Sequence, residues 1–234
     1  MKQIYYFSTI CVFFILQLNA NAQLSNFKQG PQPDIYNTKS KSFEGLIKFI
    51  QITPEDTLYY TYYIKDRMVR MDAFESKNFN EQAESYMLFY LDQKMIYAFK
   101  PSRKMFVNVP PKSFIPTNDD NFRIIKSNNS KKINGYRCYQ WRVRNKNQNT
   151  EVSYWVANDN FDFFDDFLKL WNRSEKHAAY FLKVPENKGF FPLVSEERTT
   201  LREEKMTLKV VEIKKQTLNR TLFEIPADFK NYEH

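Results

Sequence analysis

The sequence predicts an α+β domain in which a large curved antiparallel β-sheet, a half-open barrel of about 10–11 strands, packs against one main amphipathic helix. Three observations predict this class. Apolar and polar residues alternate with a period of two through most of the chain after residue 42, in short runs separated by turn residues. One segment, 159–176, changes to a helical period. Phe and Tyr number 22 and 15, enough aromatic surface for a substantial core.

The strands are read from this alternation in chain order. A hairpin is predicted from strands at 43–49 and 57–64, because residues 53–56 (Thr-Pro-Glu-Asp) supply turn chemistry between them. The double proline at 110–111 ends strand pairing, since proline cannot donate to the ladder. Further strands are predicted at 67–73, 86–91, 95–99, 104–109, 122–126, 136–144, 151–157, 190–199 and 205–214, with a short terminal one at 222–225.

The main helix is predicted within 159–176. Phe164, Phe167, Leu168 and Trp171 fall at i, i+3, i+4 and i+7, which places them on one stripe of a helix. Acidic residues crowd the start of the segment and basic residues its end, which suits the helix dipole. A second, weaker helix is expected at 75–84. No internal repeat or further domain boundary is found after residue 42.

The first residues are typical of a secretory signal peptide. Lys2 precedes an apolar run at 4–18, which ends in an Ala-Asn-Ala cleavage site, so we expect cleavage after Ala22. Cys11 lies inside the apolar run rather than at the cleavage point, so a lipoprotein is not expected. The protein should then be periplasmic or secreted, with no transmembrane segment. The expected organisation is a signal peptide at 1–22, a flexible leader at 23–41 and a single domain at 42–234.

Composition excludes several kinds of site. Two Cys, two His and four Gly among 234 residues argue against a disulfide framework, a histidine-rich metal site and a glycine-rich phosphate loop. No catalytic residue, metal or cofactor is therefore predicted. His177 is expected at the surface or as a cap just after the helix, and Cys138 is expected to be buried and inert. The net charge of +8 is spread among acidic residues, so nucleic acid is not expected as a partner.

The aromatic residues are the candidate site. They lie on predicted strands and on the helix, where they could either fill a core or line a cavity for an apolar ligand. The candidate lining residues are Tyr60, Tyr62, Phe89, Phe99, Tyr139, Trp141, Trp155, Phe164, Phe167 and Trp171.

Several segments together resemble a known group of proteins. These are 43–45 (FEG), 62–72 (YYIKDRMVRMD), 133–141 (INGYRCYQW) with 154–156 (YWV), and 223–229 (FEIPADF). Their order resembles an uncharacterised family of secreted Bacteroidetes proteins that shares the LolA/LolB-like lipoprotein-carrier fold. The resemblance implies a periplasmic half-open barrel that is closed by helices over an apolar cavity. In the carriers an arginine on an early strand helps to hold the helical lid, and Arg67 or Arg70 stands in a similar stretch here.

Three functions follow as hypotheses. The first is a non-enzymatic periplasmic binding protein for a lipid, a lipoprotein acyl chain or another hydrophobic ligand. The second is an envelope interaction module that binds another protein through a sheet edge or a basic face with Lys209, Lys214 and Lys215. The third is a hydrolase using two of the carboxylates Asp162, Asp165 and Asp166. The favourable effect of acidic residues at a helix N-terminus and a solvated helix face explain these carboxylates better. The missing histidine pairs and metal clusters favour the first two.

Overall fold

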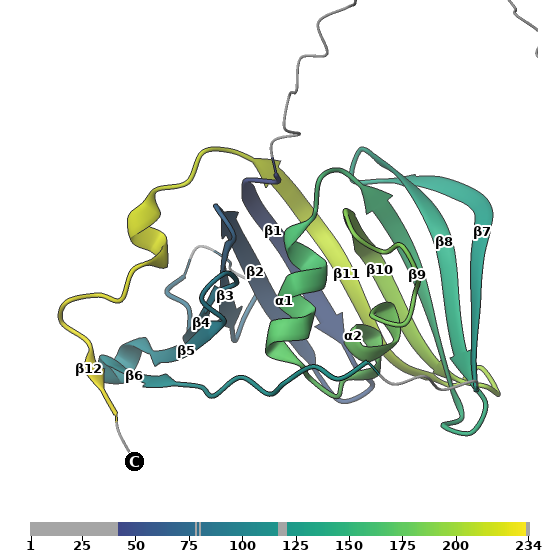
Figure 1. Cartoon of the computed structure of the whole chain (residues 1–234), viewed down its shortest axis with the longest axis horizontal. Coiled ribbons are helices and arrows are strands. Elements are labelled where there is room, and N and C mark those ends of the chain that lie inside the picture. The colour runs from purple at the N-terminus through teal and green to yellow at the C-terminus, as the bar shows by residue number, and fades with distance from the viewer. Residues whose placement is uncertain (1–41, 78, 80, 117–120, 233–234) are drawn as a thin grey trace, which may run out of the picture. The chain divides into compact units, whose positions relative to one another are not determined.

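The computed structural model describes residues 42–77, 79, 81–116 and 121–232; the expected signal peptide and leader lie outside them. Twelve strands form one sheet in the order β12-β6-β5-β4-β3-β2-β1-β11-β10-β9-β8-β7 (Figure 1). The fold confirms the predicted α+β class, a large curved antiparallel sheet with one main helix. The strands are β1 (Gly45–Ile52), β2 (Thr57–Lys65), β3 (Met68–Phe74), β4 (Ser85–Tyr90), β5 (Met95–Lys100), β6 (Met105–Asn108), β7 (Phe122–Ile133), β8 (Tyr136–Asn145), β9 (Thr150–Asn158), β10 (Phe190–Thr199), β11 (Glu204–Lys215) and β12 (Lys230–Asn231).

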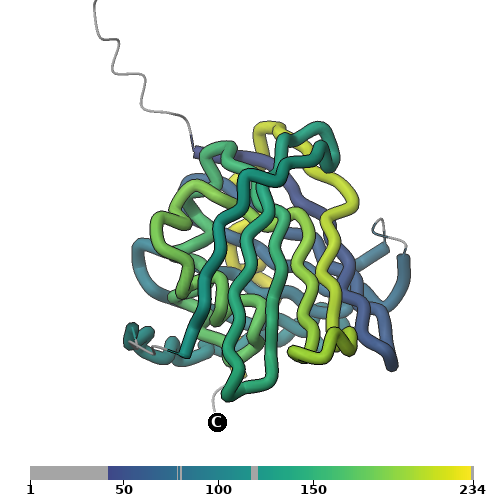
Figure 2. Tube along the Cα trace, turned by 90° about the vertical axis from the view of Figure 1, so that its right-hand side faces the viewer, coloured from purple at the N-terminus to yellow at the C-terminus, as the bar shows by residue number. Residues whose placement is uncertain are grey.

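Two meanders make up the sheet. Strands β1–β6 pair antiparallel in sequence, and so do β7–β9 and, after the helices, β10 and β11. The meanders join where β1 pairs with β11 (Figure 2). Gly45 begins β1 with φ +150°, and a Cβ there would lie 2.1 Å from the carbonyl oxygen of Lys214. Only glycine therefore fits where the two meanders meet.

Two helices lie on one face of the sheet, α1 (Phe163–Trp171) and α2 (Lys176–Phe181) (Figure 1). Asn172 ends α1 in the left-handed conformation, and its side-chain amide donates to the carbonyls of Lys112 and Ser113. The core lies between the helices and this face. Phe181 of α2, for example, packs with its ring centroid 5.2 Å from that of Phe164 on α1.

The C-terminal segment, residues 216–232, packs against the opposite face of β3–β6. The Tyr90 hydroxyl donates to the carbonyl of Phe223, and the ring of Phe229 lies 5.8 Å from that of Phe99. A second apolar cluster forms there around Tyr86, Leu88 and Phe99. β12, in the same segment, pairs parallel with β6.

Three details correct the sequence prediction. The weaker helix at 75–84 is wrong, because its described residues form bends and a turn. The strand at 222–225 is instead a 3₁₀ helix, η2 (Arg220–Phe223), whose start is capped by the Asn219 side chain. The helical segment at 159–176 ends at Trp171, and the separate helix α2 follows; a further 3₁₀ turn, η1, spans Pro101–Arg103. No helix among the described residues has the length and apolarity needed to cross a membrane.

Candidate functional site

A pocket of about 530 Å³ lies between the two helices and the sheet. Its walls come from β1–β4, β10 and β11 on the sheet side and from α1, α2 and their connection on the other. Most of the lining is apolar or aromatic, and polar groups are interspersed. The principal lining residues are Phe49, Leu58, Tyr60, Tyr62, Met71, Met87, Phe164, Leu168, Trp171, Phe191, Leu208 and Val210, with Gln51, Arg173, Glu175, His177, Ser195 and Lys209.

Four of the ten candidate aromatic residues line this pocket: Tyr60, Tyr62, Phe164 and Trp171. Tyr60 and Tyr62 are two positions apart on β2, so both side chains point to the same face of the sheet. Phe49 of β1 pairs with Tyr60 on that face. The ring of Phe49 stacks on Tyr60 at 5.2 Å and meets the edge of Tyr62 at 4.6 Å. Burial raises the pKa of the Tyr62 phenol far above its ordinary value, so the group stays neutral.

Three other candidates belong to the packed core. The rings of Phe89 and Phe167 lie 4.8 Å apart under α1, and both residues are fully buried. Trp141 packs 4.7 Å from Phe190. None of the three lines the pocket, so these rings fill space between the helices and the sheet rather than enclose it.

The last three candidates also lie outside the pocket. Phe99 belongs to the cluster under the C-terminal segment. The ammonium group of Lys131 lies 4.0 Å from the centre of the Trp155 ring. The guanidinium of Arg137 lies 5.5 Å from the centre of the Tyr139 ring. Alternation shows which residues of a strand share a face, but the sequence alone does not show which face the helices cover.

Two buried polar atoms stand at the helix end of the pocket. Trp171 Nε1 and His177 Nδ1 are buried and have no hydrogen-bond partner within the described residues. Burial lowers the pKa of His177 to about 4, against the opposing effect of Glu175. His177 therefore does not sit at the surface as expected: it is part of α2, and its ring is partly buried against the pocket.

The two candidate arginines contact different elements. Arg67, in the tight β2–β3 turn, bonds Asp166 of α1 and Asp92 of the β4–β5 turn, each at 2.8 Å. Arg70 instead binds Asp72 at 2.7 Å and donates to the carbonyl of Leu222 in the C-terminal segment. Arg67 thus links α1 to the sheet, whereas Arg70 contacts the C-terminal segment on the opposite face.

The helix carboxylates do not line the pocket. Asp166 pairs with Arg67, Asp165 pairs with Lys169 one turn later, and Asp162 stands at the N-cap of α1. In the part of the chain that the structure describes, no group of three or more His, Cys, Asp or Glu residues could hold a metal ion. Cys138 is buried and free, and burial raises the pKa of its thiol.

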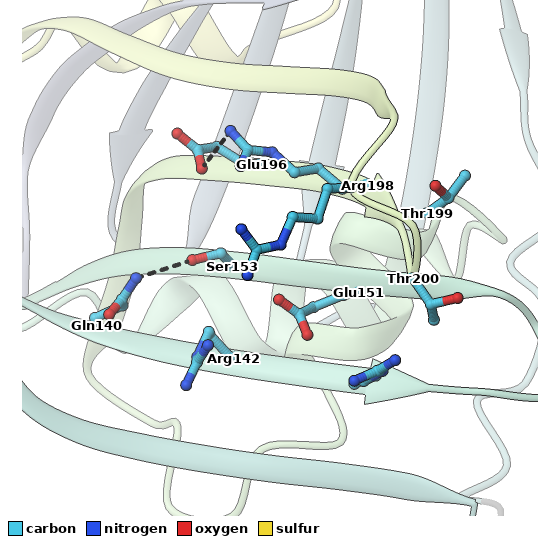
Figure 3. A pocket seen from close by; sticks show the side chains of 10 residues that line it. Gln140, Arg142, Glu151, Ser153, Glu196, Arg198, Thr199 and Thr200 are labelled. Carbon is cyan, nitrogen blue, oxygen red and sulfur yellow. Dashed lines mark hydrogen bonds and ion pairs between the residues drawn. The ribbon is translucent and has the colours of Figure 1, made fainter.

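A second hollow, of about 400 Å³, lies on the helix-free side of β8–β10 (Figure 3). We call it the arginine groove; its arginines are Arg142, Arg144, Arg198 and Arg202, with Glu151 and Glu196 between them. Sequence reasoning missed this groove. The available signal was the arginine pair at i and i+2 on one strand, which period two places on the same face.

Comparisons with known proteins give a family but no curated relative. No curated protein matches the chain. An uncharacterized conserved protein from Thermus thermophilus matches with a TM-score of 0.50 and 12% identity, over 83% of this chain and 92% of that one. This likeness supports the fold.

Two further solved structures are similar at lower scores. The MucA/MucB complex of Pseudomonas aeruginosa gives a TM-score of 0.44 at 7% identity, over 79% of this chain and 56% of that one. A candidate outer membrane lipoprotein-sorting protein domain from Vibrio parahaemolyticus gives 0.31 at 10% identity, over 76% and 87%. The family match covers nearly all of the described domain: residues 43–229 fit the family described as a domain of unknown function, DUF4412, and the chain belongs to that family.

Proposed function

We propose that this chain is a periplasmic or secreted, non-enzymatic binding protein that holds a lipid or another hydrophobic ligand in the pocket between the helices and the sheet. The observation that carries the proposal is the pocket itself. Its volume of about 530 Å³ lies within the roughly 300–1,000 Å³ of small-ligand sites, and aromatic and aliphatic side chains dominate its lining.

The polar groups of the pocket support an amphipathic ligand. The Trp171 indole N–H can only donate, so a ligand oxygen that accepts from it would satisfy a donor that has no partner within the described residues. Arg173 and Glu175 lie in the same lining and offer charged contacts for a polar end of the ligand. An acyl chain with an ester or carboxyl group has this combination of properties.

The first test is to purify the chain from Gln23 onward without detergent, and to record native mass spectra before and after solvent extraction. We expect an adduct that is released on denaturation and extracts as a lipid. A titration with the apolar fluorescent probe N-phenylnaphthylamine should then show saturable binding to the extracted protein.

A pair of matched variants locates the binding. Ala73→Trp places an indole in the pocket and should weaken probe binding about tenfold or more, because the indole occupies ligand volume. Val211→Trp adds the same ring at an exposed position of β11 and should leave binding unchanged. Equal probe affinities in the two variants would contradict the proposal.

An empty, tightly folded protein would instead favour an envelope interaction module. Lys209, Lys214 and Lys215 are exposed on β11, and Lys215 pairs with Asp159 at 2.5 Å. Reversing the charge of these three lysines should then abolish the co-purification of a partner that the unaltered chain retains.

A further inference from the structure

We infer that the arginine groove is a second binding site, for a phosphate group. It lies on the face of the sheet opposite the helices and shares no lining residue with the apolar pocket. The inference is therefore independent of the proposed lipid-binding function.

The groove carries an excess of positive charge on a fixed floor. Its four arginines face two glutamates, which leaves two positive charges uncompensated. Strand register sets their positions: Glu151 on β9 pairs with Arg144 of β8 on one side and with Arg198 of β10 on the other. Because three neighbouring strands hold these residues, a ligand would meet guanidinium groups whose backbone is already ordered (Figure 3).

Three of the four arginines of the groove have no ion pair among the described residues. Among the described residues, the one ion pair between groove residues joins Arg198 to Glu196 at 3.3 Å. The Nε atoms of Arg144 and Arg198 are buried and lack hydrogen-bond partners in this part of the structure. The Arg198 side chain as a whole is 42% exposed, so an oxyanion in the groove can accept charge-assisted hydrogen bonds from the accessible part of its guanidinium.

The hollow continues across β8. A smaller space of about 160 Å³ is lined by Arg142, Arg144 and Glu151 again, and Arg123 of β7 joins them. The positive surface thus extends over four strands. At the other end Thr200 donates to the Asn149 side chain, which joins the β10–β11 turn to the β8–β9 turn beside the groove.

Phosphate fits this arrangement better than a single carboxylate does. One guanidinium fork occupies both oxygens of a carboxylate, whereas a phosphate group offers further oxygens to a second fork. Arg144 and Arg198 approach the groove from strands on either side of β9, so a group with more than two acceptor oxygens can bridge them. The phosphate could belong to a soluble compound or to a lipid headgroup.

The test is calorimetric titration of the unaltered chain with pyrophosphate at constant ionic strength, because salt screens such contacts. We expect saturable binding. The double variant Arg144→Gln/Arg198→Gln should weaken it about tenfold or more, since charge-assisted hydrogen bonds are lost. Arg137→Gln, at an exposed position of the same strand β8, makes the same chemical change outside the groove and should leave affinity within about twofold.

Circular dichroism checks that the double variant is folded. If it is not, the single variant Arg142→Gln replaces it, because Arg142 is exposed and its loss should leave the fold intact. The absence of saturable binding up to about 10 mM pyrophosphate would overturn the inference. So would equal weakening by Arg137→Gln and by the groove variants.

Vesicles distinguish the two sources of phosphate. Sedimentation with phosphatidic acid vesicles, but not with phosphatidylcholine vesicles, and its inhibition by pyrophosphate would assign the groove to a lipid headgroup. Pyrophosphate binding without vesicle binding would assign it to a soluble phosphate compound. In either case the groove variants should weaken the binding that is observed.

Discussion

The two faces of β10 differ in chemistry although they share one backbone. Ser195 lines the apolar pocket under the helices, and its neighbour Glu196 lines the arginine groove on the other side. The same holds along β9, where Tyr154 is fully buried toward α2 and Ser153 borders the groove. Because side chains alternate across a strand, one run of sequence builds both surfaces.

The position of the helices determines which face of the sheet carries the apolar pocket. On the covered face, α1 and α2 lie over the sheet and leave a hollow among aromatic and aliphatic side chains. On the uncovered face, charged side chains remain partly solvated and the hollow is a groove. The two sites should therefore depend on different parts of the fold.

The largest expected effect comes from removing a ring that packs between the main helix and the sheet. Phe167→Ala should lower the free energy of unfolding by about 3–5 kcal/mol, because the ring is fully buried and packs against Tyr62, Phe89 and Trp171. Trp155→Ala, which removes a partly buried ring below Lys131, should cost less. Urea unfolding measures both. Equal losses would show that the helices add little to the packing of the face they cover.

The pocket should also make stability depend on pH through His177. Its pKa is about 4 in the folded chain and about 6.5 when unfolded, so the unfolded state binds more protons between these values. The free energy of unfolding is therefore not reduced by this group above about pH 6.5. It falls as the pH drops from 6.5 toward 4, by up to about 3 kcal/mol.

Thermal melts at pH 7 and pH 4.5 measure this loss. His177→Gln should be less sensitive to pH than the unaltered chain, and a variant with the same pH dependence would rule out this histidine as the cause.

The contact between Arg67 and Asp166 tests how firmly α1 is held to the sheet. Both side chains are 40% exposed, so solvent screens the ion pair and its loss should cost only about 1 kcal/mol. A double-mutant cycle with Arg67→Gln and Asp166→Asn isolates the pair, with Asp92→Asn as the control for the other partner of Arg67. A coupling energy near zero would mean that packing alone holds the helix.

The smallest expected effect is across the sheet. Ala73→Trp should leave pyrophosphate binding within about twofold of the unaltered value, and Arg144→Gln/Arg198→Gln should leave probe binding equally unaffected. Titrations of both variants with both ligands measure this. A larger cross-effect would show that the strands transmit a change from one face of the sheet to the other.

The sheet and the main helix could be predicted because their patterns are local. Alternation marks β1–β6 and β8–β11, and the stripe from Phe164 to Trp171 marks α1. Helix α2 is six residues long, too short for a periodic signal, and β12 is a two-residue pairing set by contacts with β6. The second half of β7 is polar (SNNSKKI), so alternation could not reveal it.

The sites depend on information that is not local. Which aromatic residue lines a hollow and which fills the core depends on where the helices lie above the sheet. The groove depends on the register that places Glu151 between Arg144 and Arg198, residues 54 positions apart. Of the ten aromatic residues that pattern alone singled out, four therefore line the pocket, and pattern indicated none of the groove.

The pairing of β1 with β11, which joins the two meanders, affects how the chain folds. Its paired residues are at least 155 positions apart, as Ile52 and Thr207 are. Contacts of such sequence separation form late and slow the folding of a domain. Until they form, each meander has an unpaired edge that could pair with another chain. The glycine at the start of β1 permits the close approach of β1 to β11 that pairs these two edges with each other. We therefore expect the yield of folded protein to depend on how readily β1 and β11 pair.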